Sequence, residues 1–201
     1  MTDAILPLIL SALAIMGSPG PSTISLTAVT ATFGARRALP YFAGLVIGTT
    51  LVLVAVAAGV TVAILAVPYA SAILSVAASI YILYLAWQIA TAPPLGSAYV
   101  VAGNPPPAWG GIVLGVANPK AWVAIGAVFA AHSVAADQTA DAILKTAILT
   151  VLIVVIHAAW LGAGALFAEF LRDPVRSRIA NIAMAILLVV TAVWAVVPRG
   201  G

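Results

Sequence analysis

Two ionisable side chains lie inside long apolar stretches and are therefore candidates for chemistry away from water. Lys120 lies in VANPKAW, and His157 lies in IVVIHAAW. Ionisable groups placed inside a membrane are costly and usually serve a function. We expect Lys120 to hold a carboxylate or respond to protons, and His157 to carry a proton, because imidazole titrates near neutral pH. The structural alternatives are a lysine that reaches the interface or bonds a carbonyl, and a neutral histidine that hydrogen-bonds between helices.

The stretch GSPGPS offers a second kind of chemistry, which uses the backbone. Pro19 and Pro21 have no N–H group, so the carbonyls of Ile15 and Gly17 lose their helical donors. Gly20 between the two prolines lets the chain turn. The freed carbonyls are predicted to accept hydrogen bonds from an ammonium group.

The same stretch is predicted to divide one helix into two half-helices, about residues 4–18 and 21–33. Pro21 suits the first position of the second half-helix. The N–H groups at the start of that half-helix carry partial positive charge and favour a carboxylate. Ser22, which follows directly, is a further candidate substrate contact.

A matching break is predicted about 100 residues later, in VANPKAW. Pro119 frees the carbonyl of Gly115, and Asn118 either donates to a substrate or satisfies freed carbonyls. Lys120 adds a positive charge at the start of the next half-helix. The alternative is that the prolines only kink packed helices. The residues that we assign to a binding site for a zwitterion or an anion are Pro19, Gly20, Pro21, Ser22, Asn118, Pro119 and Lys120.

Hydroxyl and indole groups add weaker candidates. Ser18, Ser22, Thr49 and Thr50 can line a polar path, although hydroxyls in membrane helices usually bond the carbonyl four residues earlier. Trp160 lies deep in its apolar stretch, where it can either pack in the core or contact a substrate.

The elements that must position these residues are membrane helices. Hydrophobic residues make up 64% of the 201 positions and charged residues 6%, whereas soluble domains have about 25% charged residues. So few charges could not cover a water-facing surface, so we predict an all-α integral membrane protein in contact with the lipid bilayer. The formal charge of +3 rests on too few residues to indicate a nucleic-acid partner. With no cysteine, thiolate metal sites are excluded, and we expect neither a bound metal nor a cofactor.

Six apolar stretches are long enough to cross a bilayer, which needs about 20 residues per helix. They cover about residues 4–33, 39–66, 70–92, 108–131, 141–168 and 178–198. The Pro- and Gly-rich linker PPLGSAYVVAGNPPP follows the third stretch. It divides a single transmembrane domain, residues 1–201, into halves of residues 1–100 and 101–201.

The two halves are predicted to form a 3+3 inverted repeat. A shift of about 100 positions places residues 19–21 on residues 118–120 and overlays the next two stretches of each half. Because each half has an odd number of spans, the second half enters the membrane from the opposite face. In such repeats the interrupted helices mark a binding site near the midplane. We therefore predict that the first and fourth spans are broken, at PGP and NPK, and that the breaks meet.

Positive charges predict the orientation, because short loops rich in Lys and Arg stay in the cytoplasm. Arg36 and Arg37 lie in the first loop, and Arg172, Arg176 and Arg178 lie in the fifth. Both loops are predicted to face the cytoplasm, which places both termini outside.

Two pairs of glycines at GxxxG spacing predict close packing between helices. The pairs are Gly44 with Gly48 and Gly111 with Gly115. Faces of this kind would also permit a homodimer.

The chain resembles the LysE/RhtB family of bacterial amino-acid exporters, the LysE-type translocators. The resemblance is carried by GSPGPS, by GARRALPYFAGLVIG in the first turn, by YILYLAWQ in the third stretch and by GIVLGVANPKAW in the fourth. It implies export of an amino acid or related metabolite across the bacterial cytoplasmic (inner) membrane, by proton exchange. It also implies a central site made of Pro19, Gly20, Pro21, Asn118, Pro119 and Lys120.

We therefore predict a secondary transporter, not an enzyme, that exports a small zwitterionic or carboxylated metabolite by proton antiport with alternating access. A divalent metal-ion transporter is one alternative, although no Asp or Glu lies deep in a span. An intramembrane serine hydrolase is another, with Ser18 or Ser22 as nucleophile and His157 as base, although Gly-x-Ser-x-Gly is absent from the sequence. A partner subunit that transports nothing is the third.

Overall fold

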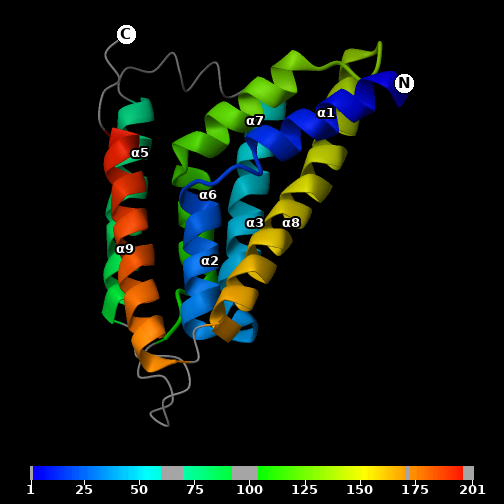
Figure 1. Ribbon diagram of the computed structural model, residues 1–201. Helices are drawn as coiled ribbons and strands as arrows, with labels where there is room; N and C mark the ends of the chain where they lie inside the picture. Colours follow the sequence, from blue (N-terminus) through cyan, green and yellow to red (C-terminus); the bar gives the residue numbers. More distant parts are fainter. Residues whose placement is uncertain (1, 60–69, 92–103, 171–172, 197–201) are drawn as a thin grey trace.

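The computed structural model describes residues 2–59, 70–91, 104–170 and 173–196, and all regular elements in these ranges are α-helices (Figure 1). The helices are α1 (Thr2–Ile15), α2 (Pro21–Phe33), α3 (Ala35–Ala57), α5 (Ala70–Thr91), α6 (Ala108–Ala117), α7 (Pro119–Ala131), α8 (Gln138–Phe170) and α9 (Pro174–Val196). Most of the predicted central linker and the end of the second apolar stretch lie outside the described residues.

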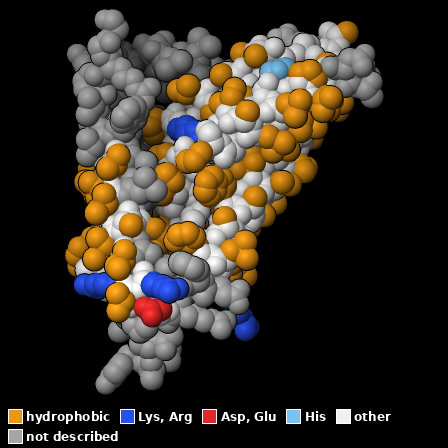
Figure 2. Space-filling view, in the orientation of Figure 1, with side chains coloured by type: hydrophobic (Ala, Val, Ile, Leu, Met, Phe, Trp, Pro, Cys, Tyr) orange, Lys and Arg blue, Asp and Glu red, His pale blue; other side chains and the backbone are white. Residues whose placement is uncertain are grey.

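The described helices agree with an all-α membrane protein. Two helical segments are each long and apolar enough to cross a bilayer, Ala35–Ala57 and Gln138–Phe167. α6 and α7 meet the same criteria together, as one span bent by 59°. Large apolar side chains lie exposed over the surface (Figure 2), among them Val123 and Leu166. The count of six spans and the inverted repeat stay predictions.

The helices are arranged around an upright group formed by α2, α3 and α6 (Figure 1). α8 runs obliquely along this group and packs on both α2 and α3, while α5 and α9 form a pair at one side. α1 and α7 lie across the upper end, where they contact one another. α1 and α7 are the outer halves of the two broken helices, so the breaks lie beneath them.

The two GxxxG pairs face each other between α3 and α6. A Cβ added at Gly48 would lie 2.5 Å from the carbonyl oxygen of Ile112, and one at Gly115 would lie 2.9 Å from the Cα of Gly48. The predicted close packing is therefore confirmed, and the backbones approach as small residues in membranes allow. Because these faces pack against each other within the chain, they are not free to form the contact of a homodimer.

Three helix boundaries differ from the predictions. The half-helix α1 ends at Ile15 instead of residue 18, because a residue that precedes proline, here Ser18, avoids the helical region. Only Gly34, with φ of 84°, separates α2 from α3. The predicted first loop is therefore a single residue, and Arg36 and Arg37 lie in the first turn of α3.

The third difference is at α9, which begins at Pro174 instead of residue 178. The Asp173 carboxylate accepts hydrogen bonds from the N–H groups of Arg176 at 3.0 Å and Val175 at 2.9 Å. This is the pattern of a helix N-cap, and the bond from Arg176 lowers the pKa of the Asp173 carboxyl. Arg176 and Arg178 therefore lie on the first turns of a helix, and Arg172 lies outside the described residues.

Candidate functional site

The chain leaves the helical path between α1 and α2 at the PGP stretch. Gly20 has an extended backbone, with φ of −168° and ψ of −179°, and Pro21 is the first residue of α2, as predicted. The hydroxyl of Thr23 accepts a hydrogen bond from the N–H of Gly20 at 2.9 Å and donates to its carbonyl at 3.1 Å. The break is therefore held in one conformation by its own helix.

The second break is centred on Asn118, between α6 and α7. Its Oδ1 accepts a hydrogen bond from the N–H of Lys120 at 3.1 Å, so Asn118 is the N-cap of α7 and Pro119 is its first residue. The indole of Trp122 donates to the carbonyl of Val116 at 2.8 Å. The N–H of Lys120 bonds the side chain of Asn118 instead of the carbonyl of Val116, and the indole of Trp122 bonds that carbonyl in its place.

The two breaks are in direct contact. The Asn118 Nδ2 donates to the hydroxyl of Ser22 at 2.8 Å. The Lys120 ammonium donates to the Ser18 hydroxyl at 2.8 Å, to the Pro19 carbonyl at 3.1 Å and to the Ser18 carbonyl. A Cβ on Gly20 would lie 2.6 Å from the Cδ of Lys120. The structure thus brings the seven residues assigned to the site together. Lys120 donates to two carbonyl oxygens, as expected from the structural alternative in which this lysine bonds a carbonyl.

A cavity opens beside this contact. It holds about 430 Å³ of empty space, its open mouth included. Its polar lining is Gly20, Ser22, Thr23, Thr49, Asn118, Lys120 and His157. Apolar residues, mainly from α7 and α8, complete the walls. Pro19, Pro21 and Pro119 shape the breaks but do not line the cavity.

His157 lies on α8 and faces the same cavity. It is buried, with 5% of its surface exposed. The ring nitrogen Nδ1 lies 2.8 Å from the carbonyl oxygen of Ile153. The other nitrogen, Nε2, has no hydrogen-bond partner among the described residues. Both candidates for proton coupling, Lys120 and His157, therefore line one cavity.

Thr49 is a polar lining residue that sequence reasoning left undecided. Its hydroxyl was expected either to line a polar path or to bond its own helix. The hydroxyl is buried and makes no hydrogen bond within the described part of the chain. Its position on α3, facing the cavity, was not readable from the spacing of polar residues.

Two of the carbonyls predicted to accept from an ammonium group already accept a hydrogen bond within the chain. The hydroxyl of Ser18 donates to the carbonyl of Ile15 at 2.8 Å. The indole of Trp160 donates to the carbonyl of Gly17 at 3.1 Å. Trp160 therefore closes the first break rather than contacting the cavity. Gly115 packs against Gly48 and does not line the cavity either.

A buried lysine away from the two breaks was not anticipated. Lys145 on α8 is 5% exposed and pairs with Asp141 at 2.7 Å. Its ammonium also donates to the carbonyls of Phe129 at 2.8 Å and His132 at 3.0 Å. The i,i+4 spacing of Asp141 and Lys145 was the available signal. This pair fastens the end of α7 to the start of α8, away from the cavity.

The geometry bears on the alternative functions. Among the described residues, no three His, Asp or Glu side chains come together as a metal site would require. The Nε2 of His157 has no serine partner, whereas a Ser–His pair for nucleophilic catalysis needs that hydrogen bond. The hydroxyl of Ser18 is bonded by Lys120, and that of Ser22 by Asn118.

Comparison with known proteins identifies the family. Residues 13–198 match the profile of the LysE type translocator family. The chain is 30% identical to a cysteine/O-acetylserine efflux protein of Escherichia coli (strain K12), over 88% of this chain and 89% of that protein. A protein of the same description from Shigella flexneri matches equally well. No solved structure gives a significant match to the chain. The chain therefore belongs to the LysE type translocator family and is a membrane transporter rather than an enzyme.

Proposed function

We propose that this transporter exports a small zwitterionic amino acid, or a related carboxylated metabolite, by proton antiport with alternating access. The observation that carries the proposal is the ammonium group of Lys120, which lines the cavity where the two breaks meet. Its partners are a hydroxyl and two carbonyls. In the described part of the chain, no carboxylate pairs with it.

A charge without a counter-charge calls for a ligand of opposite sign. Lys120 is only partly buried, and an ammonium that is partly removed from water is stabilised by an opposite charge. Within the described residues Lys120 has hydrogen bonds but no ion pair. A substrate carboxylate at the cavity would supply that pair. Asn118 and the start of α2 lie beside it, and N–H groups at a helix start favour an anion.

The other residues that line the cavity indicate which class of substrate it can bind. Met16, Ala121, Ala124 and Ile125 are among the apolar residues that line the cavity, and none of the described residues in its lining is acidic. A substrate with a cationic side chain would therefore find no partner there. The curated relatives are named for the efflux of cysteine and O-acetylserine, and we assign this chain to substrates of that size and charge.

The alternating-access mechanism rests on the proposed 3+3 inverted repeat, with halves of residues 1–100 and 101–201 and six spans. In that repeat α3 corresponds to α8 and α5 to α9, and both pairs are in contact. Such contacts are expected around a two-fold axis in the membrane plane. The two broken helices would then be the elements about which the halves rock.

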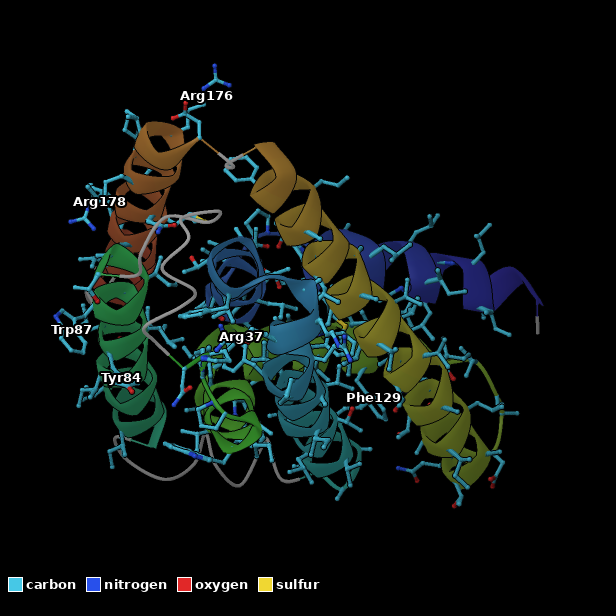
Figure 3. All side chains as sticks on the ribbon, turned by 90° about the horizontal axis from the view of Figure 1, so that it is seen from below. Arg37, Tyr84, Trp87, Phe129, Arg176 and Arg178 are labelled. Atoms are coloured by element: carbon cyan, nitrogen blue, oxygen red, sulfur yellow. The ribbon has the colours of Figure 1, made fainter. Side chains whose placement is uncertain are left out.

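The orientation that we propose places the lower end of Figure 1 in the cytoplasm and both termini outside the bacterial inner membrane. α3 and α9 begin at that end, and their first turns carry Arg36, Arg37, Arg176 and Arg178. Figure 3, seen from that end, labels three of these arginines. Clustered arginines at one end are typical of the cytoplasmic side.

Counterflow in proteoliposomes tests the function. The purified full-length protein is loaded with unlabelled L-amino acids, and uptake of labelled L-cysteine is followed under reducing conditions, with and without a pH gradient. We expect uptake that responds to the gradient and is abolished in Lys120→Met, while the variant still inserts and folds. Uptake unchanged in Lys120→Met would overturn the role of Lys120, and uptake indifferent to the gradient would overturn proton antiport.

A further inference from the structure

The hydrogen bonds of His157 define which of its nitrogens carries the hydrogen. The carbonyl of Ile153 can only accept, so the Nδ1 that lies 2.8 Å from it is the N–H nitrogen. In the neutral ring Nε2 is then an acceptor with a free lone pair. Within the described ranges that atom has no hydrogen-bond partner, although His157 is 5% exposed and lines the cavity.

Thr49 supplies a second unsatisfied oxygen from a different helix. It is 6% exposed, it lines the same cavity, and its Oγ1 has no partner in the described ranges. A buried polar atom left without a hydrogen bond is costly, so native structures rarely retain one. Two of them on one cavity, from α3 and α8, indicate a ligand group that donates hydrogen bonds.

The group that fits is the ammonium of the substrate. Within the proposed function, Lys120 takes the carboxylate of a zwitterion, and the ammonium then needs acceptors of its own. The carbonyls of Ile15 and Gly17 are satisfied by Ser18 and Trp160. We propose that His157 Nε2 and Thr49 Oγ1 form the ammonium subsite, and that a proton on Nε2 excludes the ammonium from it.

This subsite would couple substrate to proton through a single lone pair. When a proton binds, Nε2 becomes a donor with positive charge, so it can no longer accept from an ammonium and repels it. Substrate and proton then occupy the transporter in alternation, which is what antiport requires. The inference rests on the proposed function and adds to it the atom at which the exchange occurs.

Other charged or titratable groups lie away from His157 in the described residues. α2 has none, and those of α3 are Arg36 and Arg37 at its far end and Tyr41, whose hydroxyl donates to Ser25 at 3.1 Å. On α8 itself, Asp141 and Lys145 pair with each other near the start of the helix. The side chains of Asp3 on α1 and of Glu169 on α8 lie outside the described part. Among the described residues, Lys120 is the charged group that shares the cavity with His157.

Three thiols, one with both charged groups and two with a single charged group each, test the assignment. L-cysteine has both groups, 3-mercaptopropionate lacks the ammonium, and cysteamine lacks the carboxylate. Their affinities are measured by competition against labelled L-cysteine on the purified full-length protein in detergent with a reductant. We expect His157→Leu and Thr49→Val to bind L-cysteine and cysteamine about ten- to a hundredfold more weakly and 3-mercaptopropionate as before. Lys120→Met should show the complementary pattern, with only cysteamine unchanged.

Matched variants separate this pattern from damage to the fold. Thr150→Val removes a hydroxyl from α8 that bonds its own helix and does not line the cavity, so all three affinities should stay as in the wild type. If His157→Leu and Thr49→Val weaken all three thiols alike, the subsite is wrong. If binding depends on Lys120 but ignores both residues, the proposed function stands and the subsite falls. If the wild type binds none of the three, both fall.

The proton is tested by pH. Between about pH 5 and about pH 7 the carboxylate and thiol of L-cysteine keep their charge states, because they titrate near 3.5 and 8.5. Affinity of the wild type should fall on acidification, by at most about tenfold per pH unit. His157→Gln keeps an acceptor oxygen but cannot be protonated, so it should bind L-cysteine with no such slope. His132→Gln, outside the cavity and next to Ser11, should keep the slope. An unchanged slope in His157→Gln would overturn the exchange of proton and ammonium at Nε2.

Discussion

The side-chain amide of Asn118 donates a 2.8 Å hydrogen bond to the hydroxyl of Ser22, and so joins two helix breaks that lie in different halves of the chain. The same side chain caps α7 through its Oδ1. One residue therefore sets both the start of a half-helix and the distance between the two breaks. The cavity lies at this junction, and both residues line it.

Replacement of Asn118 should separate its two roles. Asn118→Ala loses the cap and the bond to Ser22, so we expect the free energy of unfolding to fall by about 0.5–2 kcal/mol for the cap alone, and L-cysteine binding to weaken. Asn118→Ser keeps a good cap but is too short to reach across. Thermal unfolding in detergent should therefore find Asn118→Ser close to the wild type, with binding as weak as in Asn118→Ala. Wild-type binding in Asn118→Ser would contradict the bridging role.

Gly20 is a position where one methyl group should disable the site without unfolding the protein. Its Cβ would lie 2.6 Å from the Cδ of Lys120. Lys120 would have to move, because Gly20 is fixed by its bonds to Thr23, and its ammonium would lose the oxygens around Ser18. We expect Gly20→Ala to lose L-cysteine counterflow while unfolding at nearly the wild-type temperature. Gly162→Ala is the control, since no atom lies within 4 Å of a Cβ there.

The two helix breaks could be predicted because their cause is local. Proline lacks an N–H wherever it occurs, so Pro21 and Pro119 mark the first residues of half-helices, and both do so in the structure. The contact between the breaks was expected from the proposed repeat between the halves, which was inferred from the sequence alone. The hydrogen bond between Asn118 and Ser22 is one of the contacts by which the two breaks meet.

Residues whose role depends on distant partners could not be assigned. Trp160 satisfies the carbonyl of Gly17, 143 positions away, and nothing in the sequence pairs them. Lys145 is buried because the carbonyls of Phe129 and His132 reach it through the fold. Thr49 becomes a candidate only because its hydroxyl has no hydrogen-bond partner among the described residues. Sequence patterns report local donors and periodicity, whereas these three depend on tertiary packing.

The contact between α3 and α6 should tolerate no side chain larger than hydrogen at Gly48. An added methyl group would lie 2.5 Å from the carbonyl oxygen of Ile112, which belongs to rigid helix backbone. Overpacking of this kind costs about 1–3 kcal/mol, so we expect Gly48→Ala to unfold at lower denaturant concentration than the wild type. Gly162→Ala in α8 should unfold with the wild type. Equal stability of both variants would show that α3 and α6 can separate without loss.

Trp160 should matter for stability through one hydrogen bond. Trp160→Phe keeps an aromatic ring but removes the donor to the carbonyl of Gly17. The bond is only partly buried, and a fully buried carbonyl left without a partner costs about 1–3 kcal/mol, so the free energy of unfolding should fall by no more than that. Trp87→Phe on α5 is the control, because Trp87 points outward (Figure 3) and is 65% exposed. A stability loss as large in Trp87→Phe would show that the indole, and not this bond, is responsible.

The two lysines, Lys120 beside the cavity and Lys145 on α8, should respond in opposite ways to removal of their charge. Lys145→Met removes the ion pair with Asp141 and the bonds to the carbonyls of Phe129 and His132, so the variant should unfold more easily than the wild type. The double variant Asp141→Asn with Lys145→Met should recover part of that loss, because no lone charge is left. Neither residue lines the cavity, so the folded fraction should bind L-cysteine as the wild type does.

Lys120 makes no ion pair within the described residues, so Lys120→Met should retain stability and lose binding. If Lys145→Met instead folds normally and loses binding, the transport pathway reaches the start of α8 and the separation of structural from substrate lysine is wrong.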